Sequence, residues 1–120
     1  MTLATINKTV YQGVDDAIPF VITDTTGAPR DITTASFEWT AYHNVTGDVL
    51  TKTIGDGLAL GDEDGQVAVL FTADEMTIPP LTYTYQLEMT ITVAAVTTTT
   101  LEAWGYLQVE PGRILEEVTP

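Results

Sequence analysis

Residues 81–92 alternate strictly between apolar and polar side chains, and this alternation constrains the fold more than any other feature of the chain. Six large apolar side chains occupy the odd positions of the segment, and six polar side chains occupy the even positions. A β-strand points successive side chains to opposite faces, so this period of two predicts a long strand with one buried face. No segment of the chain shows the period of an amphipathic helix.

Shorter alternating runs recur along the rest of the chain, separated by Gly, Pro, Asp and Asn. Threonine occurs 23 times, and this excess of a β-branched residue favours strands over helices. About seven or eight strands bounded by such turn residues predict an all-β fold, an antiparallel β-sandwich. The expected strands cover residues 3–11, 17–23, 36–43, 49–54, 58–60, 66–72, 81–92 and 97–109. Residues 73–80 are expected to form a single helical turn that ends at two prolines.

The register of the strands also predicts which side chains form the core. Phe37 and Trp39 share one face of their strand, and Tyr85 and Leu87 share the apolar face of the long strand. We therefore expect these four side chains to pack together between the sheets, with Trp39 near the centre.

The chain is expected to form one β-sandwich domain, residues 11–109, between an N-terminal strand or arm, residues 1–10, and a C-terminal tail, residues 110–120. Both flanks carry apolar side chains that a sandwich of roughly 100 residues does not need. These side chains either pack back onto the domain or bind neighbouring subunits, and we expect neighbours. The residues expected to make this protein interaction are Leu3, Ile6, Arg113, Ile114 and Leu115.

The charge of the chain argues against several classes of partner. Four basic residues stand against 17 acidic ones, which gives a formal net charge of −13 at pH 7. Nucleic acids and anionic membranes would repel such a chain, so neither is an expected partner. The acidity either keeps the protein soluble or directs it to a basic partner surface. The chain has no cysteine, and its first residues lack the features of a signal peptide, so we expect a soluble protein made in the cytosol.

Residues able to do chemistry are few and scattered in the sequence. His43 is the only histidine, so a zinc site built from imidazole or thiolate ligands lacks its further ligands. The acidic turn of residues 62–64 supplies carboxylates for calcium in principle, but its spacing does not match a calcium-binding loop, and a solvated turn is the simpler interpretation. We therefore expect no catalytic, cofactor-binding or metal-binding residues and no enzymatic activity.

Taken in order, several segments of the chain resemble a family of small β-sandwich proteins and domains from tailed bacteriophages. In this family the amino-terminal domain of baseplate upper proteins is the best-known member. Two of the matching segments are Tyr83-Thr84-Tyr85-Gln86-Leu87-Glu88 and Gly105-Tyr106-Leu107-Gln108-Val109. The others cover residues 11–13, 15–16, 20, 24–33, 50–52, 57–58, 62–65 and 67–74. The chain departs from the family pattern at residues 79–81, where prolines replace an expected glycine, and it has no long carboxy-terminal extension for a receptor-binding or fibre domain.

The resemblance implies an Ig-like β-sandwich that serves as a non-enzymatic structural component of a bacteriophage or prophage virion. A module of this size looks like an accessory protein that binds other virion proteins, such as a capsid decoration or cement protein, or an adaptor in a tail, fibre or baseplate. It would act in many copies within a symmetric assembly. The alternative is an Ig-like module that binds carbohydrate or adheres to a host surface. Exposed Trp104 and Tyr106 that form a stacking platform would distinguish this alternative.

Overall fold

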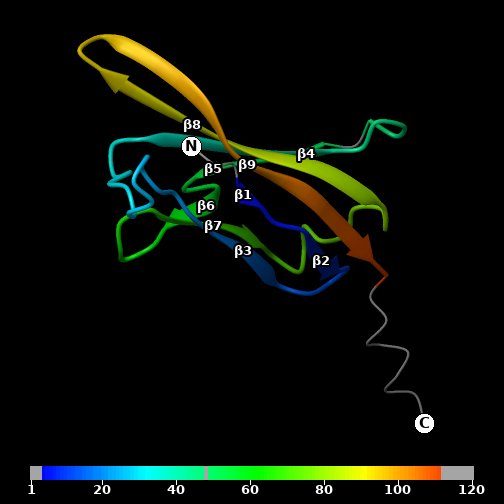
Figure 1. The fold of residues 1–120 in the computed structure, drawn as a ribbon. Helices are drawn as coiled ribbons and strands as arrows, with labels where there is room; N and C mark the ends of the chain where they lie inside the picture. Colours follow the sequence, from blue (N-terminus) through cyan, green and yellow to red (C-terminus); the bar gives the residue numbers. More distant parts are fainter. Residues whose placement is uncertain (1–3, 48, 112–120) are drawn as a thin grey trace.

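The computed structural model of the chain describes residues 4–47 and 49–111, and every regular element within them is a strand (Figure 1). The prediction of an all-β fold is therefore confirmed. The strands are β1 (Ala4–Thr5), β2 (Lys8–Tyr11), β3 (Asp16–Val21), β4 (Ser36–Tyr42), β5 (Val49–Ile54), β6 (Gly57–Leu60), β7 (Gln66–Phe71), β8 (Thr82–Val93) and β9 (Val96–Glu110). The alternating segment forms β8, and its odd-numbered side chains from Tyr83 to Met89 are buried.

All of these strands belong to one hydrogen-bonded sheet in the order β1-β9-β8-β4-β5-β6-β7-β3, with β2 also paired to β9. The sheet is mixed. Strands β1 and β2 run parallel to β9, and two residue pairs join β5 to β6 in parallel, whereas the other pairs are antiparallel. The prediction of an antiparallel sandwich is therefore not confirmed. Side-chain alternation shows that a segment is a strand, but it carries no information about the direction of the neighbouring strand.

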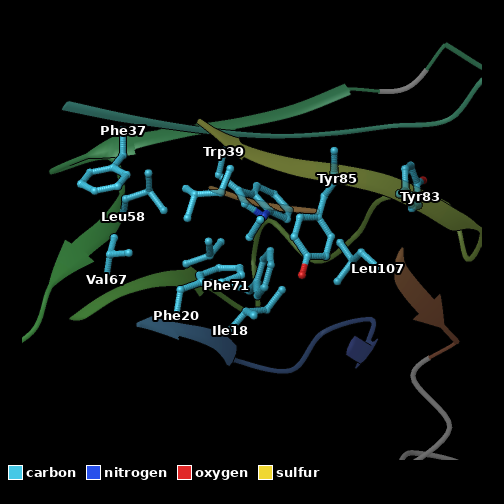
Figure 2. Packing of buried hydrophobic residues seen from close by; sticks show 14 of the residues in the cluster. Ile18, Phe20, Phe37, Trp39, Leu58, Val67, Phe71, Tyr83, Tyr85 and Leu107 are labelled. Atoms are coloured by element: carbon cyan, nitrogen blue, oxygen red, sulfur yellow. The ribbon is translucent and has the colours of Figure 1, made fainter. Parts of the chain in front are cut away.

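The sheet curls until it is nearly closed, so that its two halves face each other across one core (Figure 1). Figure 2 shows Trp39 and Tyr85 pointing from β4 and β8 toward Phe71 on β7. The Trp39 ring lies 5.5 Å from the Phe71 ring and 5.4 Å from the Tyr85 ring, measured between centroids. Phe37, Trp39, Tyr85 and Leu87 are all buried in this core, which confirms the predicted set.

Two polar contacts hold β2 and the turn after it to other parts of the chain. The turn after β2 begins at Gln12, whose side-chain amide donates a hydrogen bond of 2.8 Å to the Ile78 carbonyl. Lys8 on β2 forms an ion pair of 3.1 Å with Asp16 on β3. The Lys8–Asp16 pair thereby joins β2, at one edge of the sheet, to β3, at the other edge.

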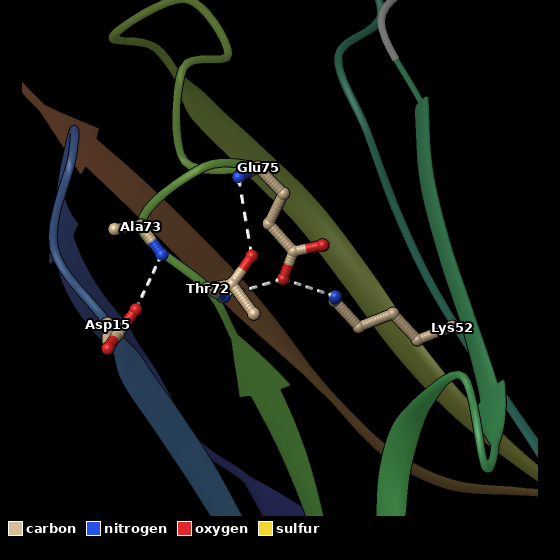
Figure 3. A network of polar contacts seen from close by, with 5 residues as sticks. All are labelled: Asp15, Lys52, Thr72, Ala73 and Glu75. Atoms are coloured by element: carbon tan, nitrogen blue, oxygen red, sulfur yellow. Dashed lines mark hydrogen bonds and ion pairs between the residues drawn. The ribbon is translucent and has the colours of Figure 1, made fainter.

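A second polar network follows β7 (Figure 3). The Thr72 amide donates to Oε1 of Glu75 at 2.8 Å, and the Glu75 amide donates to the Thr72 hydroxyl at 3.4 Å, a reciprocal arrangement that caps the turn. The same Glu75 oxygen lies 2.6 Å from the buried Lys52 ammonium. The segment predicted to be a single helical turn forms one such turn, closed by a hydrogen bond of 3.1 Å from the Met76 amide to the Thr72 carbonyl, and it does not continue into a helix.

Candidate functional site

Of the five residues predicted to make a protein interaction, the described part of the chain contains Ile6 only. Leu3, Arg113, Ile114 and Leu115 lie outside the described residues. Ile6 is partly buried against the core, and its carbonyl accepts a hydrogen bond from the Tyr85 hydroxyl. A Cβ atom at position 105 would collide with this carbonyl, so Gly105 is what allows Ile6 to lie against β9. Ile6 thus connects the first strands to the body of the sheet.

The outer part of the β8–β9 hairpin projects from the rest of the sheet (Figure 1). Strand β4 begins at Ser36, opposite Thr90, so β8 extends three residues beyond its neighbour. On the other side, β1 pairs only with Ala103 and Trp104 of β9. Within the described residues, the first part of β9 therefore has β8 as its one strand neighbour. We call this projection, residues 89–101, the β8–β9 arm.

The arm carries no charged side chain, although 18% of the residues in the chain are charged. Its free edge along β9 reads Val96-Thr97-Thr98-Thr99-Thr100-Leu101. Exposed edge strands are normally protected from pairing by lysine, proline or a bulge, and this run has none of these. The arm is therefore a surface on which another chain can bind without meeting the strong negative charge of the body.

The tip of the arm is both apolar and strained. A two-residue connection joins Val93 to Val96, and its residues Ala94 and Ala95 have φ angles of 51° and 67°. Such a turn favours asparagine and glycine, because positive φ brings the Cβ atom of other residues against the backbone. The flanking Val93 and Val96 side chains are 66% and 64% exposed. Four apolar residues thus stand at the tip in a place where polar turn residues would be more stable.

The two faces of the arm differ in polarity. On one face, hydroxyl pairs link the strands, Thr90 with Thr99 at 2.9 Å and Thr92 with Thr97 at 2.8 Å, which accounts for part of the threonine run. The other face is largely apolar and lines a groove of about 260 Å³. The groove residues are Arg30, Met89, Ile91, Val93, Val96, Thr98 and Thr100. Our sequence reasoning missed this arm, although thirteen consecutive uncharged residues, 89–101, were a visible signal.

Trp104 and Tyr106 lie side by side on the outer face of β9. They are 36% and 47% exposed, and their ring centroids are 5.9 Å apart with an interplanar angle of 81°. The rings meet edge to face, so they do not form one flat platform. The Tyr106 backbone amide donates to Oδ1 of Asn7 at 3.0 Å, which holds this part of β9 beside the chain segment between β1 and β2.

The residues considered for chemistry have structural partners or lie in exposed turns. Nδ1 of His43 accepts hydrogen bonds from the Val45 and Thr46 amides at 3.3 and 3.2 Å. The carboxylates of the acidic turn, residues 62–64, are exposed. Outside the residues considered for chemistry, the hydroxyl and amide of Thr26 lower the pKa of Asp24, and the amide and hydroxyl of Thr33 lower the pKa of Asp31. In the part of the chain that the structure describes, no three His, Cys, Asp or Glu side chains gather closely enough to hold a metal ion.

Comparisons with known proteins add no relative to this picture. The chain matches no protein-family model, and no curated protein matches it. Within residues 4–47 and 49–111, no helix is long and apolar enough to cross a membrane. Inferences about function therefore depend on the residues and on the geometry of the arm.

Proposed function

We propose that the chain is a non-enzymatic structural component of a bacteriophage or prophage virion. It acts as a small accessory module that binds other virion proteins, either as a capsid decoration or cement protein or as an adaptor in a tail, fibre or baseplate. The order of the segments that resemble phage β-sandwich modules supports this proposal. Assembly into the virion would follow synthesis in the bacterial cytoplasm.

The observation that carries the proposal is the β8–β9 arm. An uncharged projection with an unprotected edge and an apolar tip is a hazard for a protein that acts alone, because it promotes pairing with other chains. In a protein built to assemble, the same features are the means of binding. The strain at Ala94 and Ala95 agrees with this, because it costs stability at a place where contact with a partner can offset the cost.

The fold agrees with an Ig-like sandwich in one respect. The two halves of the curled sheet, β9-β8-β4-β5 and β6-β7-β3, face each other across a single core as two layers of a sandwich do. The Ig-like description thus remains part of the proposal, with strands β5 and β6 as the corner at which the chain passes from one layer to the other.

The proposal is tested on particles from the bacterium that encodes the chain. We expect mass spectrometry of purified particles to detect the wild-type protein in many copies per particle. Val93→Asp places a charge at the tip of the arm and should reduce incorporation about tenfold, since burying an unpaired carboxylate in an interface is costly. Because Val93 is exposed, this variant should keep the melting temperature of the wild type.

Val45→Asp is the matched control, because Val45 is 87% exposed on the turn between β4 and β5 and receives the same substitution. It should be incorporated at the wild-type level. The proposal fails if the wild-type protein is absent from particles. A Val93→Asp protein that reaches full occupancy would instead show that the arm is not the binding element.

A second candidate function is the binding of carbohydrate on a host surface, favoured by the partial exposure of Trp104 and Tyr106. Sugar rings stack on exposed aromatic faces. Because these two rings are nearly perpendicular, a flat sugar ring can stack on one of them but not on both together. Binding to a glycan array that Trp104→Ala abolishes and Val93→Asp leaves unchanged would favour this function over the first.

A further inference from the structure

The groove beneath the β8–β9 arm combines an apolar wall with one cation. Met89, Ile91 and Val93 from β8 line it, and Arg30 lines it as well. Its volume of about 260 Å³ is ample for aliphatic side chains, since a buried cavity of about 150 Å³ already holds a benzene molecule. The groove continues the protein core outward, because Met89 is itself a core residue.

Arg30 differs from the other cations that the structure describes. Lys8 is paired with Asp16 and Lys52 with Glu75, whereas no ion pair within the described residues involves Arg30. In a chain with 17 acidic residues, an unpaired arginine beside an apolar groove is suited to a ligand that combines aliphatic side chains with carboxylates.

We propose that the groove binds residues 114–117 of a second copy of the chain. This segment reads Ile114-Leu115-Glu116-Glu117, two aliphatic side chains followed by two carboxylates. Ile114 and Leu115 fill the apolar part of the groove, and the carboxylates that follow them pair with Arg30. The inference rests on the proposed role in assembly and deepens it, since it names the partner and the two surfaces that meet.

The length of β9 excludes binding within one chain. Thr98 lines the groove near the start of β9, and Glu110 ends the strand twelve residues later at the opposite end of the molecule (Figure 1). At about 3.3 Å per residue, these two positions are roughly 40 Å apart. Ile114 follows Glu110 by four residues, which span at most about 14 Å even when fully extended. The segment can therefore reach the groove of a neighbouring copy but not its own.

The contact joins two different surfaces, so it is heterologous. Repetition of a heterologous contact produces a closed ring or an open helical array. Each copy offers one groove and one segment, and every copy in such an assembly except those at open ends would use both.

Disulfide trapping in the purified full-length protein tests the inference, because the natural chain has no cysteine. One protein carries Ile91→Cys in the groove, and a second carries Leu115→Cys. When the two are mixed under mild oxidation, we expect a covalent dimer to form about tenfold faster than in the control mixture, since bound thiols meet at a raised effective concentration. The control mixture pairs Leu115→Cys with Tyr106→Cys, which places the cysteine on the outer face of β9.

Charge reversal tests the role of Arg30 in the same assay. Arg30→Glu in the Ile91→Cys protein should slow the cross-linking about tenfold, and Glu116→Arg with Glu117→Arg in the other protein should restore it. Equal cross-linking in the test and control mixtures would overturn the inference. So would an intramolecular disulfide in a monomer that carries Leu115→Cys or Leu3→Cys together with Ile91→Cys, because the groove would then hold a segment of its own chain.

The outcome does not depend on any particle. Cross-linking in solution by a protein that is absent from virions would support the groove contact and refute the virion role. Incorporation into virions without cross-linking would support the virion role and refute the groove contact.

Discussion

At the scale of single residues, Trp39 combines complete burial of its side chain with a buried polar atom that has no hydrogen-bond partner among the described residues. Its side chain is completely buried between Phe71 and Tyr85. Its indole Nε1–H is the one buried side-chain polar atom without a hydrogen-bond partner within residues 4–47 and 49–111. The large apolar area of the ring stabilises the core, whereas the unpaired N–H offsets part of that gain.

Substitutions of Trp39 separate these two effects. Trp39→Ala should lower the free energy of unfolding by about 3 to 5 kcal/mol, because it removes the ring and leaves a cavity. Trp39→Phe should cost only about 1 kcal/mol, since it keeps an aromatic ring and removes the unpaired donor. Urea unfolding followed by circular dichroism measures both values. Equal losses for the two variants would contradict this account of the indole.

At the scale of the elements, the β8–β9 hairpin combines a well-paired stem with a strained end. Register pairs run along its whole length apart from one irregularity after Leu87, and threonine hydroxyls link the strands beyond β4. Only the turn has a backbone conformation that its residues disfavour, because Ala94 and Ala95 both have positive φ. The hairpin thus forms in spite of its turn, through the pairing of its stem.

Relief of this strain should stabilise the protein. Ala95→Gly is expected to raise the free energy of unfolding by about 1 kcal/mol, because glycine adopts positive φ without steric cost. Ala59→Gly in β6 is the matched control, at a position with ordinary φ, and should lower it by about 1 kcal/mol. Urea titration of both variants gives the comparison. A loss of stability in Ala95→Gly as large as that in the control would contradict the assignment of strain.

At the scale of the whole molecule, stability depends on how the curled sheet is held together. The Tyr85 hydroxyl on β8 donates to the Ile6 carbonyl and so attaches the first strands to the core. Lys8 and Asp16 connect β2 to β3, and Lys52 connects β5 to the turn after β7 through Glu75. The Tyr85–Ile6 and Lys52–Glu75 contacts join residues 79 and 23 positions apart in the sequence, and the Lys8–Asp16 pair joins strands at opposite ends of the strand order.

The burial of Tyr85 makes the stability of the folded protein sensitive to alkaline pH. Desolvation raises the pKa of its hydroxyl from the ordinary value of 10.0 to about 12. Because the pKa is higher in the folded state, its contribution to stability is fully present below pH 10.0 and is lost as the pH rises toward 12. Between about pH 9 and pH 11, the wild-type protein should lose about 1 kcal/mol of unfolding free energy more than Tyr85→Phe does.

Urea unfolding of the two proteins at both pH values measures this difference. The other tyrosines are common to both proteins, so their titration cancels in the comparison. Tyr85→Phe should also be less stable at neutral pH by about 1 kcal/mol, because it lacks the hydrogen bond to Ile6. Identical pH dependence in the two proteins would show that Tyr85 does not titrate as its burial requires.

The sequence by itself determined the class of the fold and four members of the core. The alternation of residues 81–92 was enough to predict β8, and the same argument placed Phe37, Trp39, Tyr85 and Leu87 in the interior. This succeeds because the alternation of side chains along a strand is a local property, visible within a few residues, and apolar side chains on one face must be buried.

The tertiary structure alone decided which strands pair, in which direction, and what remains exposed. The contact of Asn7 with Tyr106 joins residues that are 99 positions apart, and no local pattern encodes it. The arm projects because β4 begins opposite Thr90 while β8 and β9 continue. Its groove exists because Arg30, from a distant loop, lies beside the apolar face of β8. Pairing and exposure result from the way the whole sheet curls around its core, a property that no single segment possesses.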